Sequence, residues 1–323
     1  MHLSVQDHIR FERQCNARPG LPTFLGISPP RTGTTWLHQV LSQHPQISMI
    51  TPKECSFFGK QILHKDLDWY RGGFGNGSAQ LRPIRGDISP WYARLSERSI
   101  RAARALLPDA KLILVLRNPI DRSWSQALME LGYLRNVPLD ELRETALLLH
   151  FERLRVTRYS DYPTILRRWS RVFGPDALHV ALYDDLVARP GEFLEGVLRH
   201  IGADPNWRPD VQWLSKRVYA TQTMTGGDSC RMSGFLRWYL AVRWIDSVRE
   251  LNTLLCGRVQ PWLDEMEGIA ASATPPRWRI RQHIHRTVLR WPRDLGYLGY
   301  DAAREVALAY RNQVVLRSVS TGS

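Results

Sequence analysis

The sequence predicts an α/β protein in which an open, mostly parallel β-sheet is flanked by helices and followed by a helical C-terminal segment. Three short apolar runs carry this prediction, at residues 22–28, 111–116 and 178–183, and each is followed by a loop and a helical pattern. Uninterrupted apolar runs are typical of parallel strands that are covered on both faces. Three such strand-to-helix units favour a doubly wound sheet.

The first unit starts with the run at residues 22–28, which is closed by two prolines. Apolar residues then recur at helical spacing from Thr34 to His44, and Pro45 stops the pattern. This order predicts a strand, a loop and a helix in immediate succession.

The other two units repeat this order. The strand at residues 111–116 is followed by Asn118, which suits a helix N-cap, and by Pro119, which suits a first helical turn. The strand at residues 178–183 is followed by a helical pattern over about residues 192–201.

We expect a single domain over residues 21–323, preceded by an N-terminal arm of residues 1–20. Its α/β core is expected over residues 21–220. The strand pattern then stops, and residues 221–323 are expected to form helices that pack over the ligand cleft. A chain of 323 residues can bury a large core.

The charge balance favours a polyanionic partner. The chain has 44 Lys and Arg against 31 Asp and Glu, a net charge of +13. Nucleic acid, an anionic membrane surface and a multiply charged small molecule all fit such a balance. The basic residues follow no helix-turn-helix, RRM or zinc-finger pattern, so no nucleic-acid partner is expected.

Two further features bear on the compartment. The first residues alternate between polar and apolar side chains and lack the continuous apolar stretch of a signal peptide or membrane anchor. This predicts a cytoplasmic enzyme without a transmembrane segment. The four cysteines are scattered and are expected to be free thiols; they are Cys15, Cys55, Cys230 and Cys256.

The loop of the first unit has the composition of an anion-binding site. Residues 28–35, SPPRTGTT, place backbone N–H groups and hydroxyls at a helix N-terminus. Gly33 permits a tight backbone path, and Arg31 supplies a charge that can follow the oxygen of a leaving phosphate. The residues expected to hold the phosphate of a nucleotide-like anion are Arg31, Thr32, Gly33, Thr34 and Thr35.

This P-loop-like segment is not a Walker A loop. The spacing G-x-x-x-x-G-K-[ST] is absent, and an arginine stands where the lysine would be expected. The strand at residues 111–116 ends in Arg117, where a P-loop NTPase would carry a magnesium-binding aspartate. Hydrolysis of ATP or GTP is therefore less favoured, and no metal is expected. A P-loop-type kinase of a small molecule is the alternative.

A second anion motif follows the second predicted strand. Residues 117–125, RNPIDRSWS, open a helix, and Arg117 is expected at the carboxyl edge of the sheet. Arg122 and Ser125 share a helix face because they are three residues apart. A second phosphate is expected to be held by Arg117 with help from the Ser125 hydroxyl. Two separated phosphate sites predict a nucleotide with phosphates at both ends.

At these motifs the chain resembles the sulfotransferases that use 3′-phosphoadenosine 5′-phosphosulfate (PAPS). Their 5′-phosphosulfate loop is similar to residues 28–35, and their 3′-phosphate motif, R-x-P-x-x-R-x-x-S, is similar to residues 117–125. The resemblance extends over about residues 22–202. It implies transfer of a sulfuryl group from PAPS to a hydroxyl or amine of a small-molecule or carbohydrate acceptor, with release of adenosine 3′,5′-bisphosphate (PAP). It leaves the acceptor and a homodimeric state open.

Residues 53–58, KECSFF, are similar to the K-E-x-H-F-F segment of heparan sulfate 3-O-sulfotransferases. This resemblance implies that Glu54 is the catalytic base. A carboxylate that follows the second strand of a doubly wound sheet is also expected near the phosphate loop, where it could accept a proton. The alternative is a surface glutamate paired with Lys53.

Three departures from that family pattern limit what the resemblance implies. Arg31 replaces the usual lysine, so charge stabilisation is expected rather than proton donation. Ser56 stands where the glycan enzymes carry histidine. Gly59 and Ile88 replace an Asp and a Lys that help to grip sulfated sugar, so heparan-like acceptors are not implied.

Other candidates carry simpler explanations. Asp87 is a rival base, although it is equally suited to hydrogen-bonding the turn before Pro90. His38 and His44 are expected to be packed or capping residues. The basic stretch at residues 276–294 could bind the donor, an acidic acceptor or a membrane surface, and a solvated helix is the favoured explanation.

Overall fold

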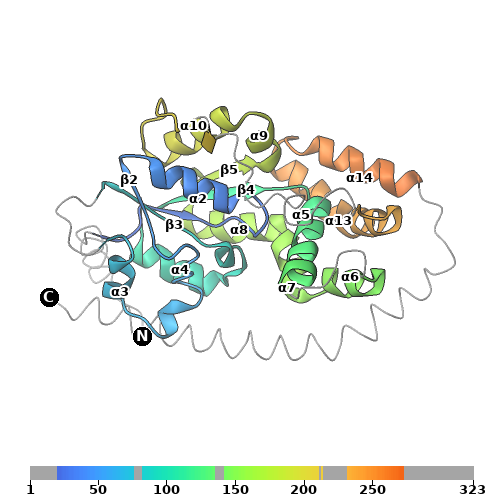
Figure 1. Cartoon of the computed structure of the whole chain (residues 1–323), viewed down its shortest axis with the longest axis horizontal. Helices are drawn as coiled ribbons and strands as arrows, with labels where there is room; N and C mark the ends of the chain where they lie inside the picture. The colour runs from blue at the N-terminus through green and yellow to red at the C-terminus, as the bar shows by residue number, and fades with distance from the viewer. Residues whose placement is uncertain (1–19, 76–81, 135–141, 211, 214–230, 273–323) are drawn as a thin grey trace. The chain divides into compact units, whose positions relative to one another are not determined.

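The computed structural model describes the segments drawn in colour in Figure 1, which are residues 20–75, 82–134, 142–210, 212–213 and 231–272. The chain divides into two compact units. The core unit comprises residues 1–116, 166–218 and 303–323, and the helical unit comprises residues 117–165 and 219–302. The basic stretch at residues 276–294 and residues 1–19 of the predicted arm lie outside the described residues.

The core unit is built on a five-stranded sheet. Its strands are β1 (Phe24–Gly26), β2 (Ile47–Met49), β3 (Ile84–Ile88), β4 (Lys111–Leu116) and β5 (Leu178–Leu182). The strand order is β2-β3-β1-β4-β5, and all four neighbouring pairs are parallel. The predicted fold class is confirmed, and the three apolar runs form β1, β4 and β5.

The strand order places the predicted loops at one edge of the sheet. Because the strands are parallel, the segments that follow β1, β2 and β3 all leave the carboxyl edge. β1 lies between β3 and β4, with Leu25 opposite Asp87 on one side and opposite Leu112 on the other. The chain leaves β1 toward β2, and later crosses from β3 to β4, so the strand order reverses beside β1. Ligands of open α/β sheets bind at such a point.

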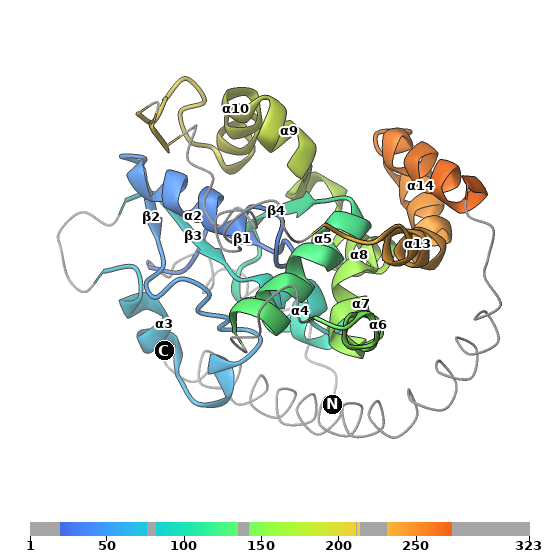
Figure 2. The same cartoon turned by 45° about the vertical axis from the view of Figure 1, so that its right-hand side comes forward.

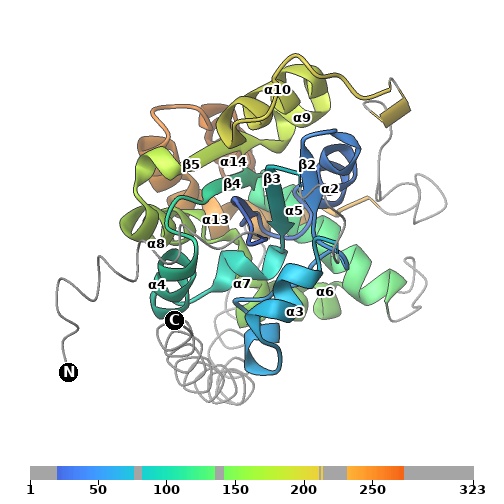
Figure 3. The same cartoon turned by 90° about the vertical axis from the view of Figure 1, so that its left-hand side faces the viewer.

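Helices cover both faces of this sheet (Figures 1 and 3). On one face, α2 (Thr34–Gln43) and α10 (Pro190–Ile201) share a buried apolar cluster with β4. On the other face lies α4 (Glu97–Leu106). Residues of β4 from Leu112 to Leu116 are all buried, because helices exclude water on both sides. This double coverage is the physical reason for the uninterrupted apolar run.

The remaining elements of the core unit are short. They are α3 (Leu67–Gly72), α9 (Tyr183–Ala188) and the 3-10 turns η1 (Gln61–Leu63), η2 (Pro90–Arg94) and η5 (Pro175–Ala177). The sequence predicted one helix after β5, over about residues 192–201. The structure has two, because α9 precedes α10 and is separated from it by Arg189, whose φ of −141° and ψ of 62° are not helical.

The helical unit contains no strand among its described residues. It consists of α5 (Pro119–Ala127), the π-helical turn η3 (Leu128–Tyr133), α6 (Glu144–Phe151), α7 (Leu154–Ser160), α13 (Gly234–Leu254) and α14 (Gln260–Ser272). α8 (Tyr162–Phe173) begins in this unit and continues into the core unit. α13 and α14 pack against each other (Figure 2). The expected change from strands to helices in the C-terminal part is confirmed for residues 231–272.

Several smaller predictions are also settled by the structure. Asn118 caps α5, since its Oδ1 accepts a 3.0 Å hydrogen bond from the amide of Ile120. Cys55 and Cys256 are free thiols, and the other two cysteines lie outside the described residues. None of the described helices is both long and apolar enough to cross a membrane.

Candidate active site

The loop between β1 and α2 is held by its own hydroxyl groups. Ser28 Oγ accepts a 2.8 Å hydrogen bond from the amide of Val115 and donates to the carbonyl of Ile113 at 3.3 Å. The Thr32 hydroxyl donates to the carbonyl of Pro29 at 2.8 Å and is fully buried. Ser28 and Thr32 therefore use their side chains to fix the loop.

Gly33 is the N-cap of α2 and has a left-handed backbone conformation, with φ of 86°. A glycine cannot cap the helix with a side chain, and no acidic residue lies in the first turn. The amide groups of this turn have no intrahelical acceptor, and the helix dipole makes this end positive. The residues present therefore fit an anionic group such as a phosphate.

Three predicted residues surround this helix end. Arg31 is half-buried and has a positive φ of 71°. Thr34 is buried in the first turn of α2, and Thr35 is half-buried. A non-glycine residue in the left-handed region costs roughly 1–2 kcal/mol, so the loop holds Arg31 in a conformation that it would not adopt alone.

Glu54 follows β2 at the same edge of the sheet. Its side chain is 52% exposed, and one carboxylate oxygen accepts a 2.6 Å hydrogen bond from the Lys53 ammonium group. The backbone of Glu54 has a φ of 61°, and that of Ser56 has a φ of 53°. Left-handed residues of this kind persist only where the surroundings hold them, and they gather at functional sites.

His38 connects this segment to α2. Its Nε2 lies 3.3 Å from the carbonyl of Ile50, which precedes the Glu54 segment. Burial lowers the pKa of His38, and the charges of Lys53 and Glu54 act on it in opposite directions. Lys53 and Glu54 are therefore close enough to His38 of α2 for their charges to act on it.

The rival base candidates have structural roles. Asp87 is fully buried and accepts hydrogen bonds from three hydroxyl groups, so it cannot meet an acceptor from solvent. His44 is buried, its Nδ1 accepts from the amide of Gln46 at 3.1 Å, and its ring lies 4.6 Å from that of Trp207. These contacts agree with the expectation that His44 is a packed residue.

Positions 59 and 88, which depart from the glycan-enzyme pattern, are closely packed by neighbouring apolar side chains. A Cβ at Gly59 would lie 2.2 Å from Cδ1 of Trp91, so the indole fills the space of a side chain there. Ile88 is fully buried against β1. Neither position offers a charged group to an acceptor.

The predicted 3′-phosphate motif lies in the helical unit. Arg117 directly follows β4 and is half-buried, and its carbonyl accepts a 2.7 Å hydrogen bond from the hydroxyl of Tyr162. Ser125 is buried on α5. The Asn118 side chain donates to Glu265 of α14 at 2.7 Å. These contacts fix the backbone from which Arg117 projects.

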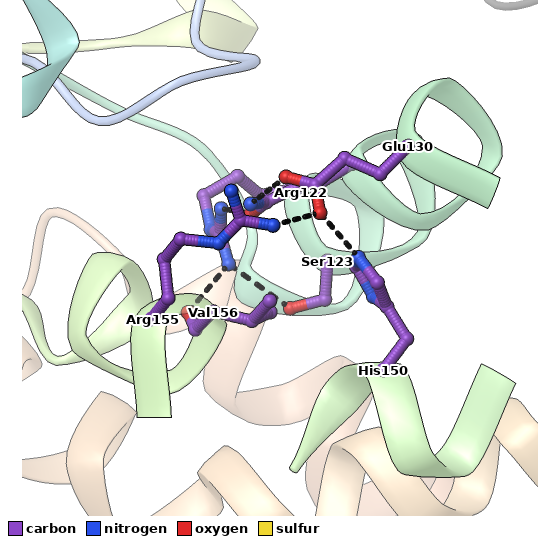
Figure 4. A network of polar contacts seen from close by, with 7 residues as sticks. Arg122, Ser123, Glu130, His150, Arg155 and Val156 are labelled. Atoms are coloured by element: carbon purple, nitrogen blue, oxygen red, sulfur yellow. Dashed lines mark hydrogen bonds and ion pairs between the residues drawn. The ribbon is translucent and has the colours of Figure 1, made fainter. Parts of the chain in front are cut away.

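Arg122 supports this motif from inside the helical unit (Figure 4). It is fully buried, and its guanidinium group donates to Ser160 Oγ at 2.6 Å and 2.9 Å and to Gln126 Oε1 at 2.6 Å. A further bond of 3.2 Å reaches the carbonyl of Val156. Arg122 thus ties α5 to α7.

Glu130 in the π-helical turn extends this network (Figure 4). It accepts hydrogen bonds from Gln126 at 2.9 Å, from His150 at 3.0 Å and from Arg155. Burial raises the pKa of Glu130, but its bonds to His150 and Gln126 and the charge of Arg155 outweigh burial and lower the pKa to about 2. Burial lowers the pKa of His150, so a neutral ring donates to Glu130 from Nε2.

The comparisons with known proteins decide the family. A model of the sulfotransferase domain matches residues 21–223. The chain belongs to the sulfotransferase family. The resemblance inferred from the two phosphate motifs is therefore confirmed.

The relatives of this sulfotransferase include much longer proteins. Human bifunctional heparan sulfate N-deacetylase/N-sulfotransferase 2 is 30% identical over 231 residues, which cover 67% of this chain and 26% of the relative. The human enzyme numbered 1 of the same name is 38% identical over 119 residues, which cover 35% of this chain and 13% of the relative. The sulfotransferase thus spans about a quarter of the first relative's length.

The crystal structure of a sulfotransferase from Alicyclobacillus acidocaldarius has the same fold. It matches with a TM-score of 0.58 at 22% identity, covering 75% of this chain and 98% of that chain. Among the described residues of the sulfotransferase, no group of three or more His, Cys, Asp or Glu side chains is arranged to hold a metal ion.

Sequence reasoning missed two polar networks in this sulfotransferase. The first joins Arg122, Gln126 and Glu130, and its signal was the spacing of four residues that places them on one helix face. The second centres on Asp87, and its signal was a charged residue inside the otherwise buried strand β3.

Proposed function

We propose that this sulfotransferase moves a sulfuryl group from PAPS to a hydroxyl or amine of an acceptor and releases PAP. The observation that carries the proposal is the N-terminus of α2, where Gly33 leaves the amide groups without a side-chain cap. Glu54 follows β2 at the same edge of the sheet, and its charge acts on His38 of α2. An anion site and a carboxylate in this relationship suit transfer of an anionic group to a nucleophile that must lose a proton.

The donor would be held by residues of both phosphate motifs. The amides of the first turn of α2, with Arg31, Thr32, Gly33, Thr34 and Thr35, are proposed to bind the 5′-phosphate end. Arg117 and Ser125 are proposed to bind the 3′-phosphate. PAPS supplies the sulfuryl group, and the proposed reaction needs no metal, since a sulfuryl group carries less charge than a phosphoryl group.

In the proposed step, the Glu54 carboxylate accepts the acceptor proton as the acceptor oxygen or nitrogen bonds to sulfur. The bond between sulfur and the 5′-phosphate oxygen breaks at the same time, and its electron pair remains on PAP. Arg31 and the loop amides stabilise the charge that develops on that oxygen. The positive φ of Arg31 supports this role, because residues held in such conformations gather at functional sites.

The acceptor is proposed to be a small molecule or a carbohydrate. The names of the human relatives include heparan sulfate, which makes a glycan amine or hydroxyl a reasonable class to test. Position 59 is a glycine filled by Trp91, and Ile88 is buried. Since neither position offers a charge, we favour an acceptor that is not gripped through sulfate groups there. A cytoplasmic location remains part of this proposal.

The deciding experiment uses radiolabelled PAPS with a panel of acceptors that includes para-nitrophenol and a glucosamine oligosaccharide. We expect label to pass to at least one acceptor in the presence of EDTA, with stoichiometric release of PAP. Labelled ATP with magnesium serves as the competing donor. Phosphoryl transfer from ATP without sulfuryl transfer from PAPS would replace this proposal with the small-molecule kinase.

A further inference from the structure

Asp87 is the centre of a buried hydrogen-bond network in the core unit. Its Oδ2 accepts from the hydroxyls of Tyr70 at 2.8 Å and Tyr92 at 2.5 Å, and its Oδ1 accepts from Ser89 at 2.7 Å. The carboxylate is fully buried. An ionised carboxylate is an acceptor only. Three hydroxyl donors satisfy it: Tyr70 of α3, Tyr92 of η2, and Ser89, which directly follows β3.

The network reaches the backbone that carries Glu54. Because the single hydrogen of the Ser89 hydroxyl is donated to Asp87, the Ser89 oxygen is left to accept, and the amide of Ser56 donates to it at 2.8 Å. Ser56 Oγ in turn donates to the carbonyl of Glu54 at 3.2 Å. The chain of bonds therefore runs from Asp87 through Ser89 and Ser56 to Glu54.

The same tyrosines hold the residues that follow. The ring of Tyr70 stacks on Phe57 with centroids 4.0 Å apart and an interplanar angle of 5°. Phe58 contacts Tyr70 edge-on at 5.8 Å and Tyr92 at 5.9 Å. The tyrosines of the Asp87 network therefore hold Phe57 and Phe58 by their side chains, in addition to the hydrogen bond that Ser89 accepts from the amide of Ser56.

The anchored segment has an unfavourable backbone conformation at two residues. Glu54 and Ser56 are both non-glycine residues with positive φ, on either side of buried Cys55. Outside contacts must hold such a conformation, since it is not favoured locally. The Glu54 side chain is nevertheless half-exposed, so an accessible carboxylate stands on a fixed backbone.

We propose that Asp87 is a positioning residue, which holds the Glu54 carboxylate in its reactive place through Ser89 and the amide of Ser56. This rests on the proposed role of Glu54 as the base. Asp87 does not touch the acceptor or the donor. Its function would be to supply the acceptor oxygens that keep Ser89 oriented toward the Glu54 segment.

The test compares Ser89→Ala with Ser96→Ala, a matched control. Ser96 also accepts a hydrogen bond from a backbone amide, that of Ser99, but it caps α4. Both variants are expected to lower the melting temperature. Only Ser89→Ala should lower kcat, by about 10- to 100-fold as misplaced catalytic groups do, with the Kd for PAP unchanged within about twofold.

A double-mutant cycle separates positioning from a general structural effect. In the Glu54→Gln background, Ser89→Ala should cause no further fall in kcat, because the group that it positions is already gone. An equal further fall in that background would overturn the proposal. Asp87→Asn leaves one acceptor oxygen for three hydroxyl donors, so it should lower kcat in the same direction as Ser89→Ala, but by less if that oxygen faces Ser89.

Hydrogen exchange supplies a readout that is independent of turnover. The peptide covering residues 54–58 should exchange faster in Ser89→Ala than in the wild type or in Ser96→Ala. Unchanged exchange in this peptide would overturn the positioning role, whatever the activity. A different result would separate the two proposals. If the wild-type protein transfers no sulfuryl group from PAPS, but residues 54–58 still exchange faster in Ser89→Ala, then the proposed function fails while the anchoring of the segment stands.

Discussion

Leu186 of α9 lies directly against the N-cap of α2, so that a Cβ added at Gly33 would come within 2.5 Å of its Cδ2 atom. Gly33 also has a φ of 86°. The backbone conformation restricts position 33 to glycine, and a larger residue there would also require the Leu186 side chain to shift. Both constraints concern the turn that would receive the donor phosphate.

Replacing Gly33 with alanine should weaken donor binding. The left-handed conformation costs alanine about 1–2 kcal/mol, and relief by a backbone shift would move the amides away from the phosphate. We expect a loss of PAP affinity of roughly tenfold or more, measured by calorimetry. Gly191→Ala is the control, because no atom lies within 4 Å of a Cβ there and its φ is not positive. Equal PAP affinity in both variants would exclude the α2 N-terminus as the phosphate site.

PAP should stabilise the wild-type protein without magnesium. A ligand at 100 times its Kd adds about 2.7 kcal/mol to the free energy of unfolding. We expect the melting temperature to rise by several degrees in EDTA and to rise no further when magnesium is added. Stabilisation by ATP with magnesium, but not by PAP, would contradict this expectation.

Arg117→Ala should reduce PAP affinity more than Ser125→Ala does. A hydrogen bond to a charged group is worth about 1.5–3 kcal/mol, and a neutral one about 0.5–1.5 kcal/mol. Calorimetric titration with PAP measures both. Arg249→Ala is the control for loss of a positive charge in the same unit, since Arg249 pairs with Asp246 and Glu267 on the surface. A wild-type Kd in Arg117→Ala would remove it from the proposed 3′-phosphate site.

The sequence predicted the fold class and located β1, β4 and β5, but not β2 or β3. It succeeded at β4 because Leu112 to Leu116 are all buried, which leaves a continuous apolar run. It also predicted the loop and the helix that follow β1, since Gly33 permits the turn between them and Pro45 ends the helical pattern. These features are determined by residues close together in the chain.

The polar networks could not be predicted with the same rules. Arg122 bonds to Ser160 across 38 positions, and Asp87 bonds to Tyr70 across 17. Such pairs depend on how distant segments pack, and periodicity carries no information about the partner of a buried polar group. The helix α9 was missed because its six residues are too few to show a helical period.

Glu130→Gln should remove a contribution to the free energy of unfolding of the helical unit that is present at neutral pH and lost in acid. The folded pKa is about 2 against 4.5 for the free group, so ionised Glu130 stabilises the fold above about pH 4.5. That contribution is lost as the pH falls through 4.5 toward 2. In urea unfolding at pH 7, we expect Glu130→Gln to lose about 1–3 kcal/mol, and the loss to shrink at pH 3.

The control for this measurement is Glu195→Gln. Glu195 pairs with Arg199 and Arg208 on the surface of α10, where such pairs contribute about 0–1 kcal/mol. Its effect should be small at both pH values. A difference between wild type and Glu130→Gln that did not depend on pH would contradict the assigned pKa.

Glu54→Gln tests the proposed base, because the substitution keeps the shape of the side chain and removes its ability to accept a proton. Donor binding is proposed to involve the two phosphate motifs and not Glu54, so the Kd for PAP should stay within about twofold of the wild-type value. Turnover should fall by roughly 10²- to 10⁴-fold, the usual contribution of a general base. Turnover is measured with radiolabelled PAPS and the best acceptor of the panel.

The control for Glu54→Gln is Glu192→Gln on α10, which removes another exposed carboxylate that pairs with an arginine, Arg189, and it should leave both quantities unchanged. The base is misassigned if Glu54→Gln keeps its turnover while His38→Ala loses it, since His38 hydrogen-bonds Ile50 and senses the charges of Lys53 and Glu54. Arg31→Ala tests stabilisation of the leaving group independently of the base. It should lower turnover whether Glu54 or His38 is the base, because Arg31 is the positive charge proposed to stabilise the departing phosphate oxygen. Full activity in Arg31→Ala would contradict the proposed mechanism even with Glu54 confirmed as the base.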